Sequence, residues 1–370
     1  MKILHIHSDE KFIRDTMWAY LDDNIDNGIV FLGNHSIQDN KVKCFKHGKK
    51  NYKAISDISA EYDIVIFNSM SLQHALICNL IKKRFPKKIV IWRFFGAELY
   101  GRLNKEMLAP ASLRYYKDER LHHFLSIVKN LLLHQATADT IFWKAVSNTD
   151  YFLGLADEEY NLLKQYFRNL PPFLQIPYRK VETTFERSLG HNQIIIGHSM
   201  DILGNHLEVL EMMNSLPCLN DYQYKMFFSY SEYSSEYTKA VCDYVKDWPS
   251  MEVIKGFMPK EKYLDVLNNS CATVINSYRQ MGMGMVFNAF REGLKVYLNP
   301  RNSMYIWLKK HGFCVFTIRD FIEDLHNRNV CLSKEQRKTN IEAMNSLASL
   351  YSSENYREQL KSLVTKEWKH

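Results

Sequence analysis

The stretch QIIIGHSMDILGNHLE (Gln193–Glu208) decides the fold class. An apolar run typical of a buried strand ends at Gly197, a polar turn follows, and Leu207, Leu210 and Met213 then recur at helical spacing. This is the repeating unit of a parallel α/β sheet. Such a turn also aims backbone N–H groups and the positive end of the helix dipole at an anion, most naturally a phosphate. An ordinary strand–turn–helix connection without a ligand has the same pattern.

Strand-like and helix-like segments alternate in this way along most of the chain, which predicts a doubly wound parallel sheet in each half. Strands are expected at 2–6, 28–32, 62–67, 88–92, 142–146, 193–197, 224–230, 251–254, 271–275 and 295–298, with a loop or weak strand in the lysine-rich 40s. Helices are expected at 11–24, from 69 to about 84, and at 117–135, 157–167, 205–215, 260–269 and 285–292. Another is expected after the 224–230 strand, ending at about 247.

Two domains are expected, because single cores stop growing at about 250–300 residues and the chain has 370. The densest run of helix and strand breakers predicts a linker near 175–190. The expected domains are therefore 1–180 and 181–370, each a Rossmann-like half. The second domain ends in a helical tail that starts at Ser333, which has capping-box spacing to Gln336.

Composition points to a cytoplasmic protein that is soluble or peripheral. The 7 cysteines are odd in number and contain no C-x-x-C pair, which favours reduced thiols over a disulfide framework or zinc site. The first residues do not read as a signal peptide, and no apolar run approaches the roughly 20 residues of a membrane span. The 14 histidines form no metal-ligand pattern, and no D-x-D pair is present, so no metal is expected.

The formal net charge of +7 is concentrated in the first third of the chain. Two clusters carry it: Lys41, Lys43, Lys46, Lys49, Lys50 and Lys53, and then Lys82, Lys83, Arg84, Lys87 and Lys88. Such clusters suit anionic lipid headgroups or an acidic ligand, and they are also common as solvated faces. Aromatic residues are not interleaved with them, which argues against nucleic acid as a partner.

Ligands of doubly wound sheets bind beyond the carboxyl ends of the strands. A second phosphate-type turn stands there in the latter half, where Gly282 and Gly284 lie between a strand and a helix. It is not a G-x-G-x-x-G fingerprint, since Phe287 stands at the third glycine position. The candidate ligand-binding residues of the latter half are Gly197, His198, Ser199, Asp201, Asn205, His206, Tyr230, Gly256, Phe257, Met258, Tyr263, Asn276, Gln280, Gly282, Met283, Gly284 and Asn299.

The first half has ionisable groups at its own strand ends. These groups are His7, Asp9, Arg93 and Glu98. Glu98 or Asp9 is a candidate general base, because a carboxylate in a closing cleft can take up a proton. A surface carboxylate at a helix start would give Glu98 the same spacing.

Four motifs together resemble glycosyltransferase family 56, the bacterial TDP-N-acetylfucosamine:lipid II N-acetylfucosaminyltransferases. They are Ser8-Asp9 after the first strand, WRFFGAELY (Trp92–Tyr100), GHSMDILGNH (Gly197–His206), and RQMGMG (Arg279–Gly284) continuing to Leu298-Asn299. Their order and spacing extend over roughly residues 1–320. Two departures stand out: His198 replaces an Asn, and Met281, Met283 and Met285 make the glycine turn rich in thioethers.

The resemblance implies a GT-B fold, two Rossmann-like domains facing across a cleft, and metal-independent transfer without a cofactor. It implies that 1–180 is an acceptor-binding domain, with His7 and Arg93 as acceptor-binding candidates. The domain 181–370 would bind the nucleotide sugar, so that its candidate residues become donor-binding candidates. The donor would be a TDP- or UDP-linked amino or deoxy sugar. The acceptor would be a polyprenyl-diphosphate-linked glycan of common-antigen or O-antigen type, at the inner face of the cytoplasmic membrane and its anionic surface.

Combined with the residue pattern, the resemblance assigns roles. Backbone N–H groups around Ser199 and 282–284 would hold the diphosphate, helped by Asn205, His206 and Arg279. These groups would take the place of a metal ion. The segment 256–258 and Tyr263 would flank the nucleobase. Asn276 and Gln280 would read the sugar.

Two other functions fit this architecture. A non-hydrolysing nucleotide-sugar 2-epimerase has two Rossmann-like halves and needs no acceptor. A glycosyltransferase-like binding subunit would keep the fold without catalysis.

Overall fold

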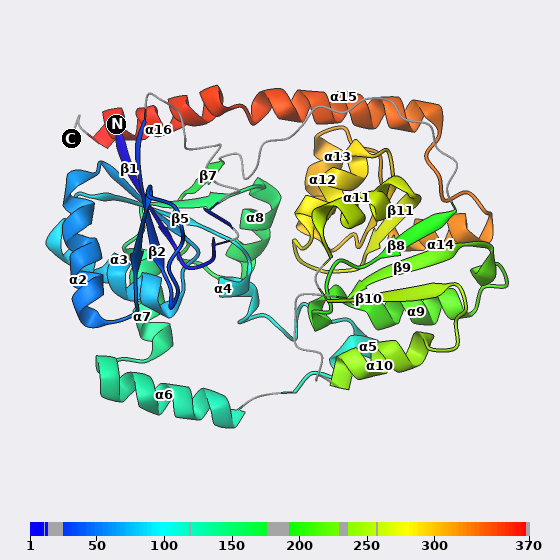
Figure 1. The fold of residues 1–370 in the computed structure, drawn as a ribbon, viewed down its shortest axis with the longest axis horizontal. Coiled ribbons are helices and arrows are strands. Elements are labelled where there is room, and N and C mark those ends of the chain that lie inside the picture. The colour runs from blue at the N-terminus through cyan, green and yellow to red at the C-terminus, as the bar shows by residue number, and fades with distance from the viewer. Residues whose placement is uncertain are drawn as a thin grey trace. The chain divides into compact units, whose positions relative to one another are not determined.

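The computed structural model describes residues 1–10, 12–13, 25–117, 120–175, 192–228, 236–256 and 258–367. Its contacts divide the chain into two compact units (Figure 1). Unit 1 comprises Met1–Gly101, Asp118–Lys180 and Leu350–His370, and unit 2 comprises Arg102–Lys117 and Val181–Ser349.

Unit 1 is built on a parallel sheet whose described strands have the order β3-β2-β1-β4-β5-β6-β7. Its central strands β4 and β5 are apolar except for their last residues, as expected where helices cover both faces of a parallel sheet. Every residue of these two strands is buried. The strands are β1 (Lys2–His7), β2 (Asp26–Leu32), β3 (Val42–Phe45), β4 (Ile64–Asn68), β5 (Ile89–Arg93), β6 (Tyr151–Gly154) and β7 (Phe173–Gln175).

The described helices of unit 1 are α2 (Lys49–Ile58), η1 (Ser59–Glu61), α3 (Leu72–Arg84), α4 (Ala97–Tyr100), α6 (Arg120–His134), α7 (Ala138–Ser147), α8 (Asp157–Tyr166) and α16 (Ser353–Glu367). The last of these comes from the far end of the chain. Tyr356, Leu360 and Leu363 of α16 are buried in one cluster with Ile3 of β1 and Ile64 of β4, so α16 completes the core of unit 1.

Unit 2 contains a second parallel sheet, with the described strands in the order β10-β9-β8-β11-β12-β13. The strands are β8 (Gln193–Ile196), β9 (Gln223–Phe228), β10 (Met251–Lys255), β11 (Ser270–Ile275), β12 (Lys295–Leu298) and β13 (Val315–Thr317). The helices are α5 (Pro110–Leu113), η2 (Ile202–Gly204), α9 (His206–Asn214), η3 (Leu219–Asp221), α10 (Glu236–Val245), α11 (Lys260–Asn268), α12 (Met283–Arg291), α13 (Ser303–Lys310), α14 (Ile318–His326) and α15 (Lys334–Leu350).

Hydrogen bonds join the segment 102–117 to unit 2. The Asn205 side chain accepts from the Ala109 N–H at 2.9 Å and donates to the Met107 carbonyl at 3.1 Å. The Glu208 carboxylate accepts from both the N–H and the hydroxyl of Ser112, at 2.9 and 2.8 Å. The short helix α5 is therefore held against α9.

The predicted parallel α/β architecture is confirmed, but one strand was wrong. Residues 142–146 lie inside α7, and the strand of this region is β6. The apolar run misled because Ile141, Phe142, Ala145 and Val146 form one buried helix face, and a short apolar run alone does not separate a strand from a helix.

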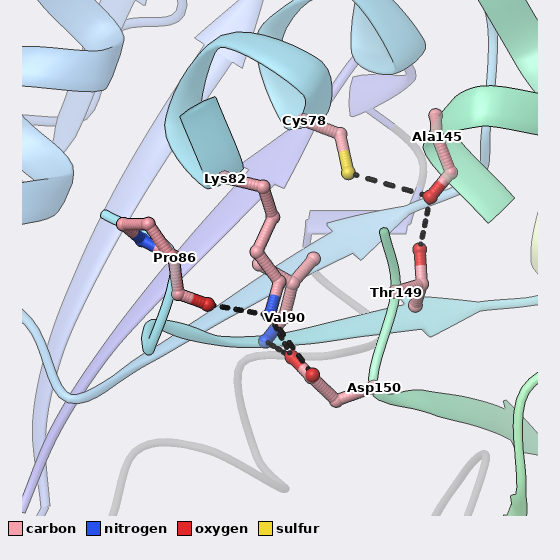
Figure 2. A network of polar contacts seen from close by, with 7 residues as sticks. All are labelled: Cys78, Lys82, Pro86, Val90, Ala145, Thr149 and Asp150. Atoms are coloured by element: carbon pink, nitrogen blue, oxygen red, sulfur yellow. Dashed lines mark hydrogen bonds and ion pairs between the residues drawn. The ribbon is translucent and has the colours of Figure 1, made fainter. Parts of the chain in front are cut away.

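Figure 2 shows what fixes the turn between α7 and β6. The Asp150 carboxylate accepts from the Val90 N–H of β5 at 2.7 Å and pairs with Lys82 of α3 at 2.8 Å. The Thr149 hydroxyl donates to the Ala145 carbonyl at 2.8 Å. These contacts bind α3, β5 and the end of α7 into one block.

The predicted capping box of the tail is confirmed: Ser333 N–H donates to Gln336 Oε1 at 3.0 Å, and Gln336 N–H donates to Ser333 Oγ at 3.2 Å. The predicted ranges 1–180 and 181–370 give each domain one continuous segment, whereas the contacts assign 102–117 to unit 2 and 350–370 to unit 1. Most of the expected helix 11–24 and of the linker 175–190 lies outside the described residues.

Candidate functional site

The two turns singled out in the latter half follow adjacent strands. The strand order of unit 2 reverses between β8 and β11, and ligands of open parallel sheets bind at this switch point. The turn 197–205 follows β8, and the turn 276–282 follows β11. The Gly197 N–H donates to the Val274 carbonyl at 2.8 Å, which fixes the two strand ends side by side.

Two glycines make this junction possible. Gly282 has φ +66° and precedes α12, and a Cβ there would lie 2.8 Å from Cγ of His198. Gly197 has φ +67°, and a Cβ there would lie 2.5 Å from Nε2 of His206. Each glycine thus supplies both a left-handed backbone and the space for an imidazole ring. His198 packs directly on the turn that starts α12.

The N-terminus of α12 is the element best suited to hold an anion. The first N–H groups of a helix have no partners within the helix, and the helix dipole is positive there. The Gly282 carbonyl accepts from Met285 and Val286 at 2.8 and 3.0 Å, so the helix begins directly at the turn. Met283 and Gly284 form its first turn, the part of a helix whose N–H groups can face an anion.

The methionines of this turn face inward. Met281, Met283 and Met285 are 7, 5 and 6% exposed, and the Thr273 hydroxyl donates to the Met285 sulfur at 3.6 Å. These three thioethers are therefore part of the buried core.

The helix that follows the 193–208 stretch has a different N-terminus. The His206 N–H donates to the Tyr237 hydroxyl at 2.8 Å, and His206 Nδ1 lies 3.0 Å from the same oxygen. The His206 ring is buried, and burial lowers its pKa to about 4, so it is neutral at pH 7. Tyr237 therefore closes the start of α9, and no sequence pattern pointed to this tyrosine.

The Arg279 side chain reaches from the 276–282 turn to the 197–205 turn. Its Nη2 lies 3.6 Å from Asp201 Oδ2, its Nη1 donates to the Gln280 carbonyl at 3.2 Å, and its side chain is 12% exposed. Asp201 also accepts from the Leu203 N–H at 2.9 Å and so caps η2. A guanidinium beside the N-terminus of α12 adds positive charge to the electrostatics of that helix end.

The predicted residues Asn276 and Asn299 form hydrogen bonds between loops. Asn276 Nδ2 donates to the Asn205 carbonyl at 2.9 Å, and Asn299 Nδ2 donates to Asn276 Oδ1 at 2.8 Å. Asn302, which the sequence argument missed, donates to the Ser277 and Arg279 carbonyls at 3.1 and 2.7 Å. It also caps α13, a role that an Asn just before a helix signals.

The remaining donor candidates are less closely connected. Ser199 is buried, with its hydroxyl 3.4 Å from His198 Nε2. Gly256 has φ +90° at the end of β10, and half-buried Met258 follows. The Tyr263 ring lies 5.5 Å from that of Phe227. Tyr230 and Phe257 lie outside the described residues.

Unit 1 has its own switch point, between β1 and β4. Asn68, at the end of β4, joins two predicted residues: its amide nitrogen lies 3.2 Å from His7 Nε2, and its amide oxygen accepts from Arg93 at 3.3 Å. All three side chains are buried. Burial, followed by the nearby charges, lowers the pKa of His7 well below its ordinary value, so Arg93 supplies the positive charge here.

Glu98 lies at the same edge of the sheet. Its Oε1 accepts from the Met70 N–H at 3.1 Å and from Trp92 Nε1 at 3.4 Å. Burial raises the pKa of this carboxyl, and the hydrogen bonds oppose that effect. Ser69 beside it has φ +85°, a strained conformation of the kind that concentrates at functional sites. Asp9, the alternative base, follows β1 in an exposed position.

The two lysine clusters differ. The six lysines of the 41–53 cluster are all exposed. In the 82–88 cluster, Lys82 pairs with Asp150, Arg84 with Asp57, and Lys88 donates to the Tyr62 carbonyl. Three of the five basic side chains in the second cluster therefore make contacts within unit 1.

Among the described residues, no three His, Cys, Asp or Glu side chains gather as metal ligands would. No helix in the described part of the chain has the length and apolar character needed to cross a membrane. A cavity of about 630 Å³ lies at the amino ends of β4 and β5 and contains none of the predicted site residues; it is lined by Ala60, Glu61, Tyr62, Asp63, Phe85, Pro86, Lys87, Lys88, Ile89 and Val364.

Two Rossmann-like units, each with a doubly wound parallel sheet, define the GT-B fold, and solved structures of that fold match the whole chain. Sucrose-phosphate synthase from Thermosynechococcus elongatus matches with a TM-score of 0.67 at 10% identity, covering 100% of this chain and 99% of that one. Anabaena HepE in complex with UDP and glucose matches with a TM-score of 0.62 at 10% identity over 99% and 100%.

The lipopolysaccharide outer core galactosyltransferase WaaB matches with a TM-score of 0.60 at 12% identity over 98% and 99%. The chain matches no family model, and a search of curated proteins gives no match. Membership in glycosyltransferase family 56 therefore stays a prediction.

Proposed function

We propose that the protein is a glycosyltransferase that moves a sugar from a nucleoside-diphosphate sugar to an acceptor hydroxyl. The observation that carries the proposal is the start of α12 at the switch point of unit 2, where Gly282 packs under His198 with Arg279 alongside. The fold supports it, since HepE and a trehalose-6-phosphate protein of the same fold have been solved with UDP and UDP-2-fluoro glucose.

The diphosphate would bind to the N–H groups of Met283 and Gly284 and to Arg279. As the bond between the anomeric carbon and the diphosphate oxygen breaks, negative charge grows on the leaving group. Preorganised N–H groups and a guanidinium stabilise such charge without having to reorient. In this proposal they do the work of a metal, and no cofactor takes part.

For a transfer that inverts the anomeric centre, Glu98 is the proposed general base. The acceptor oxygen forms the new bond to the anomeric carbon and passes its proton to the Glu98 carboxylate. A raised pKa brings a carboxyl closer to the working pH and makes it a better proton acceptor. His7 and Arg93 would position the acceptor, and their contacts with Asn68 hold the two side chains in place.

At a finer level, we propose an amino or deoxy sugar on TDP or UDP as donor and a polyprenyl-diphosphate-linked glycan as acceptor. The reaction would take place at the inner face of the cytoplasmic membrane, in the synthesis of a surface polysaccharide of common-antigen or O-antigen type. The resemblance of four motifs to glycosyltransferase family 56 supports this. The exposed 41–53 lysines, which suit an anionic membrane surface, support it further.

The test is thermal unfolding with TDP, UDP or GDP. A ligand at 100 times its Kd stabilises the native state by about 2.7 kcal/mol, which raises the melting temperature of a unit of this size by about 5–10 °C. The Arg279→Ala variant should lose most of this shift. The control is Arg319→Ala, which changes an exposed side chain of α14 and should keep the shift. A wild-type protein unaffected by all three nucleotides contradicts the proposal.

The epimerase alternative is separated by incubating the protein with the nucleotide sugar that binds best and following the sugar by NMR. An epimerase converts the sugar at its second carbon without an acceptor, whereas a transferase leaves that carbon unchanged. Binding without either reaction, in the presence of lipid-linked acceptor, would favour the non-catalytic subunit.

A further inference from the structure

Helix α6 has an apolar face that unit 1 leaves uncovered. Leu131, Leu132 and Leu133 are 46, 80 and 51% exposed, and Val128 is 39% exposed. Nine large apolar side chains are exposed in the part of the chain that the structure describes, and these four lie within six residues of one another. A cluster of this kind on a soluble protein marks an interaction site more often than chance exposure.

The opposite side of α6 attaches it to the unit. Asn130 is buried and Ile127 is half-buried, and α6 contacts α7. In Figure 1, α6 extends from α7 away from the sheet of unit 1. The helix is therefore fixed on one side and presents its leucines on the other.

The charge of α6 identifies the partner. Its sequence, RLHHFLSIVKNLLLH, carries Arg120, Lys129 and three histidines but no Asp or Glu. An apolar stripe accompanied only by positive charge is the pattern of a helix that lies in the interface of an anionic bilayer. A face that meets another protein has no such need to exclude acidic residues. With 15 residues, the helix is also shorter than the roughly 20 that a span requires.

We infer that α6 is the membrane-docking element of the protein, with Val128 and Leu131–Leu133 inserted among lipid tails and Lys129 at the headgroups. The inference rests on the proposed function for its purpose, since a lipid-linked acceptor is presented at such a surface. The exposed 41–53 lysines of the same unit have the sign needed to draw the protein to that surface.

The test is flotation of the full-length protein with phosphatidylglycerol-containing and pure phosphatidylcholine vesicles. The wild type should bind the anionic vesicles at least tenfold more tightly. The variant Leu131→Gln/Leu132→Gln/Leu133→Gln should lose at least tenfold in that affinity with an unchanged melting temperature, because the three side chains are exposed. Ile306→Gln, on a 54% exposed side chain of α13, is the matched control and should bind like the wild type.

Salt separates insertion from attraction. Salt screens headgroup charge but not apolar insertion, so part of the wild-type binding should survive high salt, whereas the triple variant should be released. Three results would overturn the inference: no vesicle binding by the wild type, equal binding by the triple variant, or a dimer in solution that the triple variant dissolves, since a second copy would then cover the leucines.

Measuring nucleotide binding as well distinguishes a failure of this inference from a failure of the proposed function. A protein that responds to nucleoside diphosphates but ignores vesicles retains the proposed function and loses the docking helix. A protein that binds vesicles through α6 but no nucleotide retains the docking helix and loses the proposed function.

Discussion

At the scale of the residue, the chemistry of Glu98 depends on its surroundings more than on its identity. Its Oε1 accepts from a backbone N–H and from the Trp92 indole, which favours the charged form, while burial favours the neutral form. The net effect is a raised pKa. A surface carboxylate with the same sequence spacing would lack that property, and the sequence alone left the two alternatives open.

Replacing Glu98 by Gln should lower the transfer rate by about 10²–10⁴-fold, the usual contribution of a general base, and leave the nucleotide-induced thermal shift unchanged. In the wild type, only the deprotonated carboxylate accepts a proton, so activity should fall as the pH falls through the raised pKa of Glu98. A pH–rate profile measures this. Asp9→Asn is the matched control; loss of activity in that variant, with activity kept in Glu98→Gln, would move the base to Asp9.

At the scale of the element, the start of α12 depends on a contact between two turns. A side chain at position 282 meets both an unfavourable φ and the ring of His198. The same ring holds the 197–205 turn against the helix that we propose binds phosphate. The two motifs are therefore one structural element, although more than 70 residues separate them.

Gly282→Ala should lower the free energy of unfolding of unit 2 by about 1–2 kcal/mol from backbone strain alone, with a further cost from the overlap with His198. It should also weaken nucleotide binding. Denaturant unfolding and nucleotide titration measure the two effects.

Gly312→Ala separates these causes, since Gly312 has φ +82° and nothing within 4 Å of its added Cβ. That variant should show the strain without the overlap or the loss of binding. Adding His198→Ala to Gly282→Ala should recover part of the stability. If the two glycine variants behave alike, the contact between His198 and Gly282 has no role.

At the scale of the whole molecule, neither unit is a continuous piece of chain. Asn205 and Glu208 hold the 107–112 segment in unit 2, and α16 supplies core residues to unit 1. The chain therefore passes between the units several times. A fragment cut at residue 180 would lack part of the core of unit 1.

Leu360→Ala tests this division. Deleting a fully buried leucine side chain costs about 2–5 kcal/mol, and Leu360 lies in the cluster with Ile3 and Ile64. Hydrogen exchange should show lost protection in β1 and β4 and retained protection in β8 and β11. Leu350→Ala, on a side chain that is 56% exposed, is the control. Equal loss of protection in both sheets would show that the units do not unfold separately.

The sequence by itself determined the type of sheet. An apolar run such as 62–67 indicates a strand that is buried on both faces. This pattern can be read from the local sequence alone. The glycines at 197 and 282 likewise mark sharp turns wherever the chain leads. The predicted parallel α/β order was confirmed for the described strands, and the apolar run 142–146, which lies in a helix, was the exception.

Only the tertiary structure decided which polar groups remain available. Asn205 and His206 have the residue types of a phosphate site, yet their hydrogen bonds go to the 107–109 segment and to Tyr237. The tertiary structure also made 142–146 a helix and placed α16 in unit 1. The physical reason is that the local sequence indicates whether a residue tends to be buried or to form hydrogen bonds. Which partner it meets depends on segments that are distant in the sequence.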